Sequence, residues 1–279
     1  MQQLDLLVLG AGWTSTFLTP LLDSSSLSYA LTSTTGRPST IKFKFDPSLS
    51  DQSYFSVLPS ARYILVTFPV RDPAHANLLL ASYAATHPRA DPRYIVLGST
   101  GIWPPGGPTF VRESCWVTRH SPYDTTNDRA RAEEAYLEAG AAVLNLSGLW
   151  DGVLRIPRRW VERVAKDKEG VKGKGSLHMI HGVDVARSIV AADDEGKRCK
   201  GQRWMLTDGF VYDWWALIAG WADAKEDGEV SEHCRWVFEL MSETGTRALP
   251  RSMEALGRCY DTREFWEKFE LVPLKGRIF

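Results

Sequence analysis

Short apolar runs and longer amphipathic stretches alternate along the first half of the chain. Runs of four to six apolar or β-branched residues bounded by turn residues predict strands, and apolar residues recurring every three or four positions predict helices. The strand-like runs lie at 4–9, 29–33, 40–45, 63–67, 93–97 (ended by Gly98) and 142–146. Helical stretches lie between them at 14–22, 74–86 and 128–140. This alternation predicts an α/β fold with a doubly wound parallel sheet.

The pattern changes after about residue 150. Helical periodicity then predominates, at 160–168, 183–192, 214–224, 233–244 and 263–269. Between the first two, residues 166–175 are rich in Lys and Gly and are expected to form a mobile loop. We therefore expect two domains. Residues 1–150 form the sheet domain, and residues 151–279 complete the sheet edge and form a small, mainly helical lobe.

Composition narrows the functional classes. The 279 residues are 44% hydrophobic, and 33 basic residues balance 34 acidic ones, without the basic excess of a nucleic-acid-binding protein. No apolar run is long enough to span a bilayer, so no membrane partner is expected. The four cysteines form no Cys-x-x-Cys pair, which favours reduced thiols in a cytoplasmic protein over a zinc or disulfide framework. We expect a monomer or homodimer that acts on a small molecule.

The most specific motif is the glycine turn that follows the first strand. Gly10-Ala11-Gly12 leads from an apolar strand into a helix, which is the context of a dinucleotide-binding turn on a Rossmann-type sheet. Gly10 permits the turn, and Gly12 lets a pyrophosphate approach the backbone at a helix N-terminus. Ser15 occupies the usual third glycine position and is small enough to pack there. Trp13 and Thr14 complete the predicted contact set of this turn.

The end of the second strand predicts which nicotinamide cofactor binds. NAD-specific sites place a carboxylate there for the ribose 2′-hydroxyl, whereas residues 32–37 contain only hydroxyls, Gly36 and Arg37. Thr34 and Arg37 are therefore expected to bind a 2′-phosphate, and NADP(H) is predicted over NAD(H). After the fourth strand, Thr67 and Pro69 are assigned to the same cofactor site.

Four segments in order resemble a known family. Residues 96–103 are similar to its Ser-Ser-x-x-Val-Tyr segment, residues 144–150 to its Leu-Arg-x-x-Gly-Ile-Tyr-Gly segment, and residues 178–186 to its Ile-His-Val-x-Asp-x-Ala segment. With the glycine turn, they cover residues 4 to about 192. The chain thus resembles the atypical and extended short-chain dehydrogenase/reductase superfamily, in its NAD-dependent epimerase/dehydratase-like branch.

This resemblance implies a catalytic set. In the family a Ser or Thr orients the substrate carbonyl, and a Tyr acts as general acid or base. A phenol has a pKa near 10 and is a poor base at neutral pH, so a Lys four residues later activates the Tyr by stabilising its phenolate. Ser99 and Tyr123 match the first two roles, but Asn127 replaces the lysine. Arg129 or Arg131 is expected to supply the missing charge. An alternative alignment, which puts residues 128–131 at the helix start, leaves no tyrosine.

Other polar and aromatic residues fall near the expected site. Thr100, Trp103 and Trp150 are assigned to the substrate pocket, with core packing an equal alternative for the two tryptophans. His178 and His181 have a possible metal spacing, but no carboxylate or cysteine cluster accompanies them, so we expect structural roles and no metal. Asp184 is expected to cap the helix at 185–192.

Two functions fit these residues. The first is an NADP(H)-dependent oxidoreductase, or a related epimerase or dehydratase, acting on a small organic substrate. The alternative is a non-catalytic NAD(P)-binding sensor or regulatory protein with a degraded Tyr–Lys dyad. The retained Ser99 and Tyr123 favour the enzyme, and the missing lysine favours the sensor.

Overall fold

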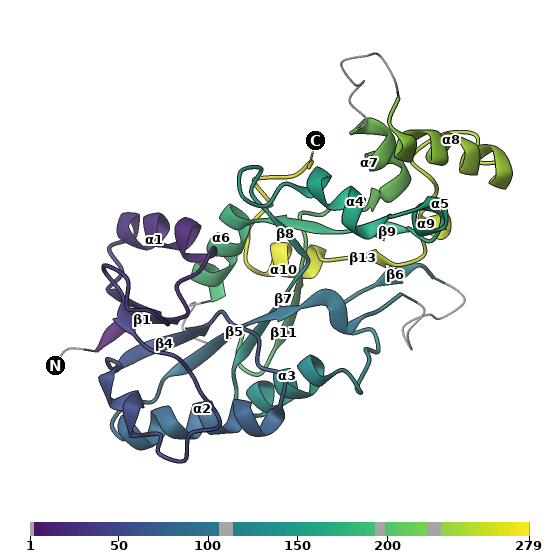
Figure 1. The fold of residues 1–279 in the computed structure, drawn as a ribbon. Coiled ribbons are helices and arrows are strands. Elements are labelled where there is room, and N and C mark those ends of the chain that lie inside the picture. The colour runs from purple at the N-terminus through teal and green to yellow at the C-terminus, as the bar shows by residue number, and fades with distance from the viewer. Residues whose placement is uncertain (1–2, 106–113, 193–198, 222–229, 279) are drawn as a thin grey trace. The chain divides into compact units, whose positions relative to one another are not determined.

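The computed structural model describes residues 3–105, 114–192, 199–221 and 230–278 (Figure 1). Its chain divides into two compact units, each assembled from separate stretches of sequence. The first contains Met1–Ile102, Asp124–Leu146 and Gly182–Leu206, and the second contains Trp103–Tyr123, Ser147–His181 and Thr207–Phe279. This division by spatial contact does not coincide with the sequence boundary drawn at residue 150, because the chain passes between the units several times.

A seven-stranded parallel sheet forms the centre of the first unit. Its order is β11-β7-β5-β4-β1-β2-β3, with every neighbouring pair parallel. The strands are β1 (Leu4–Leu9), β2 (Tyr29–Ser33), β3 (Ile41–Lys42), β4 (Ala61–Val66), β5 (Arg93–Ser99), β7 (Ala142–Leu146) and β11 (Arg203–Leu206). The order reverses between β1 and β4, which confirms the predicted doubly wound α/β architecture and places a ligand crevice at the carboxyl ends of these strands.

Helices cover both faces of this sheet (Figure 1). On one face lie α1 (Ser15–Ser24) and α6 (Gly182–Ala192), and on the other α2 (Pro73–Thr86) and α3 (Asp128–Glu138). Asp72 caps α2 by accepting a hydrogen bond from the Ala74 amide, directly before Pro73 at the first helical position. These helices bury the apolar sheet residues that the strand-like runs predicted, including Leu7, Leu9, Ile64 and Val143.

Two strands differ in length from their expected bounds. The third is only two residues long, where six alternating residues favoured a longer one. The fifth was expected to stop at Gly98 but continues to Ser99. At Gly98 the strand backbone approaches the side chains of Asn145 and Glu133 closely. A Cβ there would lie 2.6 Å from both Asn145 Nδ2 and Glu133 Oε1.

The second unit combines short helices with three two-stranded sheets. The sheets pair β8 (Gly148–Trp150) with β10 (Met179–His181), β9 (Ser176–Leu177) with β12 (Tyr212–Asp213), and β6 (Trp116–Val117) with β13 (Cys259–Tyr260). The helices are α4 (Val161–Val164), α5 (Lys168–Lys172), α7 (Trp214–Gly220), α8 (Glu232–Thr244), α9 (Met253–Leu256) and α10 (Arg263–Lys268). A 3₁₀ turn at Pro157–Trp160 leads directly into α4.

The composition of the Lys/Gly-rich stretch at 166–175 predicted a loop, but the structure shows a short helix within it. The stretch contains α5, because the Asp167 carboxylate accepts a hydrogen bond from the Gly170 amide at 2.7 Å and so caps the helix. Val171, fully buried, anchors the helix in the core. The helix expected at 214–224 ends at Gly220, and its last predicted residues lie outside the described ones.

Tryptophans account for much of the core of the second unit. Trp214 and Trp215 are buried together with Leu217, Val237 and Leu240. The Arg251 guanidinium lies 3.9 Å from the Trp215 ring centroid and pairs with the buried Asp213 at 2.6 Å. The segment around Arg251, to which the sequence assigned no chemistry, thus packs this core. Within the described stretches, no helix combines the length and the apolar character needed to cross a membrane.

Candidate functional site

The glycine turn lies at the carboxyl end of β1 and is held by hydroxyl groups from both neighbouring strands. Gly10 has a φ of 95°, and a Cβ there would lie 2.7 Å from Thr67 Oγ1, so only glycine fits. The Thr67 hydroxyl donates to the Gly10 carbonyl at 2.6 Å, and the Thr32 hydroxyl accepts from the Gly10 amide at 2.9 Å. Thr67 was predicted as a cofactor residue and is seen to shape the turn, whereas Thr32 was missed.

The second glycine of the turn faces open space. A Cβ on Gly12 would have only the Gly10 carbonyl oxygen within reach, at 4.0 Å. The helix that follows has no acidic residue in its first turn, and its N-cap residue Thr14 makes no side-chain capping bond. Ser15 is buried, and its Oγ has no hydrogen-bond partner in the described part of the chain. This cradle therefore fits a pyrophosphate, which would meet the positive end of the helix without a competing protein anion.

Arg37 reaches the same turn from the end of β2. Its guanidinium contacts the Ala11 carbonyl, and the Ser33 hydroxyl accepts from the backbone amides of Gly36 and Arg37. Thr34 is exposed in this turn, as is Pro69 beyond β4. Trp13 is half-buried and packs edge-on against Phe17, with ring centroids 5.0 Å apart. The structure thus gathers Gly10, Gly12, Ser15, Arg37 and Thr67, but shows no contact that would assign Pro69 to the site.

Ser99 lies at the end of β5 and opens onto a second pocket of the same unit. Its hydroxyl oxygen accepts from the Gly101 amide at 3.1 Å, and its own amide donates to Glu133 Oε1 at 3.2 Å. The pocket has a volume of about 270 Å³. It is lined by Arg71, Ser99, Gly101, Ile102, Asn127, Asp128 and Arg129.

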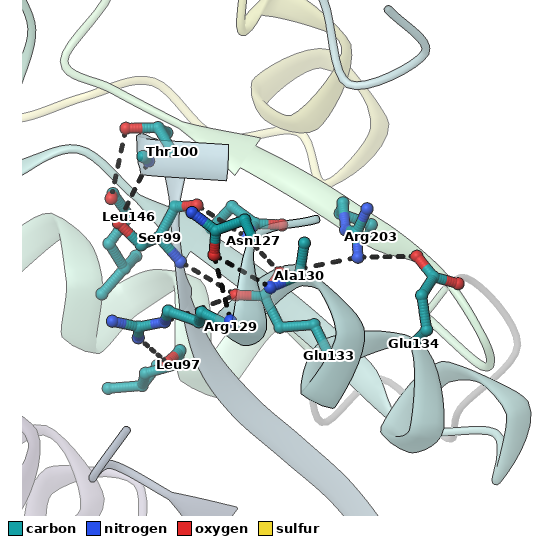
Figure 2. A network of polar contacts seen from close by, with 12 residues as sticks. Leu97, Ser99, Thr100, Asn127, Arg129, Ala130, Glu133, Glu134, Leu146 and Arg203 are labelled. Carbon is teal, nitrogen blue, oxygen red and sulfur yellow. Dashed lines mark hydrogen bonds and ion pairs between the residues drawn. The ribbon is translucent and has the colours of Figure 1, made fainter. Parts of the chain in front are cut away.

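A buried carboxylate organises the wall of this pocket, as Figure 2 shows. Glu133 accepts from Asn145 Nδ2 at 2.7 Å and lies 3.5 Å from both the Arg129 and the Arg203 guanidinium groups. Burial raises the pKa of Glu133, while these donors and cations oppose the rise. Sequence reasoning missed Glu133 and Asn145. The only available signal was the (i, i+4) spacing of Arg129 and Glu133, which is equally typical of an exposed helix pair.

Of the two arginines proposed to replace the family lysine, only Arg129 faces Ser99. Arg129 lines the Ser99 pocket and donates to the Leu97 carbonyl at 2.7 Å, and its burial lowers the pKa of its guanidinium. Arg131 is exposed and lies 4.0 Å from Asp128. Asn127 caps α3, because its Oδ1 accepts from the amides of Arg129 and Ala130 at 3.0 and 3.3 Å.

Trp103, which the sequence analysis assigned to the substrate pocket, packs in the interior of the second unit. Trp103 is 0% exposed, and its indole N–H donates to the Ser121 carbonyl at 3.0 Å. Its own carbonyl accepts from Arg258 at 2.7 Å. A fully enclosed indole offers no surface to a ligand, so core packing is the correct alternative for Trp103. Tyr123 is half-buried against it, edge-on, with ring centroids 6.3 Å apart.

The two other residues assigned to the substrate pocket, Thr100 and Trp150, differ in their surroundings. Thr100 is buried and donates weakly to the Leu146 carbonyl at 3.4 Å, which is a strand-end role. Trp150 is half-buried, with its ring edge-on to His181 at 4.8 Å. Its indole N–H is enclosed and lacks a partner among the residues that the structure describes. Trp150 therefore stays a predicted ligand contact within the second unit, which also holds Tyr123, whereas Ser99 and Thr100 belong to the first.

His178 and Asp184 form contacts with other protein groups. His178 Nε2 accepts from the Tyr260 amide at 3.0 Å, and burial, followed by the charge of Arg258, lowers the His178 pKa to about 3. No group of three potential metal ligands occurs in the described ranges. Asp184 does not lie at the N-cap position expected for it. Because α6 already begins at Gly182, Asp184 lies within the first turn and pairs with Arg187 at 3.0 Å.

Comparisons with known proteins found solved structures with a similar fold. No family model and no curated protein matches the chain. Among solved structures, a short-chain dehydrogenase/reductase superfamily protein from Agrobacterium tumefaciens with bound NAD is 14% identical, with a TM-score of 0.62 over 98% of this chain and 93% of that one. The yeast methylglyoxal/isovaleraldehyde reductase Gre2 with NADPH is 13% identical, with a TM-score of 0.61 over 97% and 94%.

A third similar structure is that of a different enzyme. The UDP-N-acetylglucosamine 4-epimerase from Bacillus cereus is 10% identical, with a TM-score of 0.59 over 98% of this chain and 95% of that one. All three identities are too low to transfer an activity, but all three alignments extend over both units. The chain therefore has the fold of the short-chain dehydrogenase/reductase superfamily, including its epimerase/dehydratase-like members, over almost its whole length.

Proposed function

We propose that this protein is an NADP(H)-dependent oxidoreductase, or a related epimerase or dehydratase, acting on a small organic substrate. The observation that carries the proposal is the open cradle at Gly12, which lies just before the N-terminus of α1 and next to Ala11, whose carbonyl contacts the Arg37 guanidinium. Such a cradle suits a dinucleotide whose pyrophosphate lies on the turn. The absence of a carboxylate from residues 32–37 favours NADP(H) over NAD(H).

Ser99 supplies the polar contact to the substrate in this proposal. When bound, the nicotinamide gives or takes a hydride. The Ser99 oxygen already accepts from the Gly101 amide, so its O–H is available for donation to a substrate oxygen. The Glu133 carboxylate fixes the Ser99 backbone, and the Arg129 guanidinium places a positive charge in the same pocket. Tyr123 is the proposed proton donor, on the strength of the family resemblance.

The second candidate is a non-catalytic NAD(P)-binding protein. It is favoured by the role of Asn127, which stands where the family has its lysine and uses its side-chain oxygen to cap α3. The two candidates share the glycine turn, so cofactor binding does not distinguish them. They differ in whether the pocket at Ser99 supports turnover.

The test is to incubate the purified protein with NADPH and a panel of small aldehydes and ketones while following NADPH absorbance. We expect NADPH consumption with at least one carbonyl, and loss of it in Ser99→Ala while NADPH affinity, measured separately by calorimetry, is retained. NADPH binding without turnover across the panel would contradict a carbonyl reductase, and would leave the sensor or an epimerase or dehydratase that does not consume NADPH. Failure to bind either dinucleotide would contradict both candidates.

A further inference from the structure

The pocket at the end of β5 has two arginines in its wall. Arg71 enters it from the segment just before α2, and Arg129 from the first turn of α3. Both line the same pocket of about 270 Å³, together with Ser99. Neither arginine is explained by the dinucleotide turn, which is held by Thr32, Thr67 and Arg37.

The positive charge in this pocket is only partly balanced by the protein. The Arg71 side chain is exposed and makes no ion pair or hydrogen bond within the part of the chain that the structure describes. Arg129 turns its Nε toward the buried Glu133. Among the lining residues Asp128 is the acidic one, and its side chain is 71% exposed and lies 4.0 Å from Arg131 outside the pocket.

The two arginines also act on each other. The charge of Arg71 lowers the pKa of Arg129, an effect that is smaller than burial and that Glu133 opposes. Two like charges held close together are electrostatically unfavourable, and a shared anion removes this penalty. A guanidinium offers paired N–H donors that match the geometry of a carboxylate or phosphate.

We propose that this pocket is an oxyanion site, in which Arg71 and Arg129 bind a carboxylate or phosphate group beside the Ser99 hydroxyl. The oxyanion has two possible sources, a charged group of the substrate or a phosphate of the dinucleotide. Only the choice between these sources rests on the proposed function. With the first source, the substrate class narrows to small carbonyl or hydroxy compounds that carry a carboxylate or phosphate.

Calorimetric titration of inorganic phosphate and, separately, succinate into dinucleotide-free protein tests the site. We expect at least one anion to bind the wild type, and Arg71→Gln to weaken it by about ten- to a hundredfold, the effect of one lost charge-assisted contact. Arg71→Glu should abolish binding. Arg131→Gln is the matched control, because it removes the same charge from an exposed arginine of the same region and should bind like the wild type.

The site is overturned if neither anion binds, or if Arg71→Gln and the wild type bind equally. The source follows from repeating the titration with NADPH-saturated protein and measuring NADPH and NADH affinities of Arg71→Gln. Anion binding that survives saturation, with unchanged dinucleotide affinities, assigns the site to the substrate. Displacement by NADPH, with NADPH and NADH weakened equally, assigns it to a phosphate that the two dinucleotides share. A protein that binds phosphate but no dinucleotide would contradict the proposed function and leave the oxyanion site standing.

Discussion

The backbone amide of Ser99 and the guanidinium of Arg129 contact the same atom, Oε1 of Glu133, at 3.2 and 3.5 Å (Figure 2). One buried carboxylate therefore positions both the hydroxyl and the positive charge of the β5 pocket. Its other oxygen is fixed by Asn145, so the carboxylate cannot turn without losing contacts on both sides. This arrangement makes the stability of the pocket dependent on a residue that does not itself line it.

Removing this carboxylate should destabilise the protein strongly. Glu133→Ala leaves Arg129, Arg203 and the Ser99 amide without their shared partner, and we expect the free energy of unfolding to fall by about 3–5 kcal/mol. The neighbouring Glu134 pairs with the same Arg203, but its side chain is 42% exposed, so Glu134→Ala should cost less than about 1 kcal/mol. Urea denaturation of both variants checks the prediction, and equal losses would contradict the central role of Glu133.

Arg37 should decide the choice of dinucleotide. A charge-assisted contact to the 2′-phosphate contributes about 1.5–3 kcal/mol, or roughly tenfold to a hundredfold in affinity. Arg37→Ala should weaken NADPH by this factor and leave NADH nearly unchanged in calorimetry. Equal loss of both ligands would show that Arg37 acts on the turn itself through its contact with Ala11.

Tyr123 should matter in the reductive direction. A tyrosine hydroxyl is protonated at neutral pH and can donate its proton without a lysine, whereas it is a poor base. Tyr123→Phe should lower the rate of carbonyl reduction by about a hundredfold to ten-thousandfold without changing NADPH affinity. A reductase that is indifferent to this substitution would leave Ser99 or a water molecule as the donor.

Restoring the family lysine should raise any oxidative activity. Because Asn127 caps α3, Asn127→Lys should also cost about 1 kcal/mol of stability through the lost cap. Asn127→Ala is the matched control, since it loses the cap without adding a charge. Oxidation rates that rise equally in both variants would show that the added charge is not the cause.

His178 should make the protein sensitive to mild acid. The unfolded chain binds a proton at this residue near pH 6.5, whereas the folded protein binds it only near pH 3. Acidification between these values therefore favours the unfolded chain, by up to about 1.4 kcal/mol per pH unit. Unfolding free energies measured from pH 7 to pH 5 should fall in the wild type and fall less in His178→Gln. Parallel curves would contradict this assignment.

The first unit was largely predictable because its signals are local. An apolar run, a glycine turn and an amphipathic helix are adjacent in sequence, so β1, the Gly10–Gly12 turn and α1 could be predicted directly. Residues such as Thr32 and Glu133 could not be, because their partners come from strands or helices that are distant in sequence. The proposal that Arg129 replaces the family lysine named a residue of the pocket, but not the carboxylate that holds it.

The second unit was less predictable for a related reason. Its sheets each consist of two strands of two or three residues, and such runs carry no recognisable periodicity. Trp103 shows the same limit, since an indole at a strand end is equally suited to a pocket or a core. Its buried position is seen only in the structure, where its indole N–H donates to Ser121 and its carbonyl accepts from Arg258.

The most direct test of the dinucleotide cradle is calorimetric titration of NADPH into Gly12→Val. A side chain at this position projects into open space, so the variant should keep the wild-type melting temperature. Gly220→Val is the control, because Gly220 is also open but lies in α7 of the second unit. We predict that the control binds NADPH like the wild type and that Gly12→Val, folded, does not bind it. Undiminished NADPH binding by Gly12→Val would contradict the account.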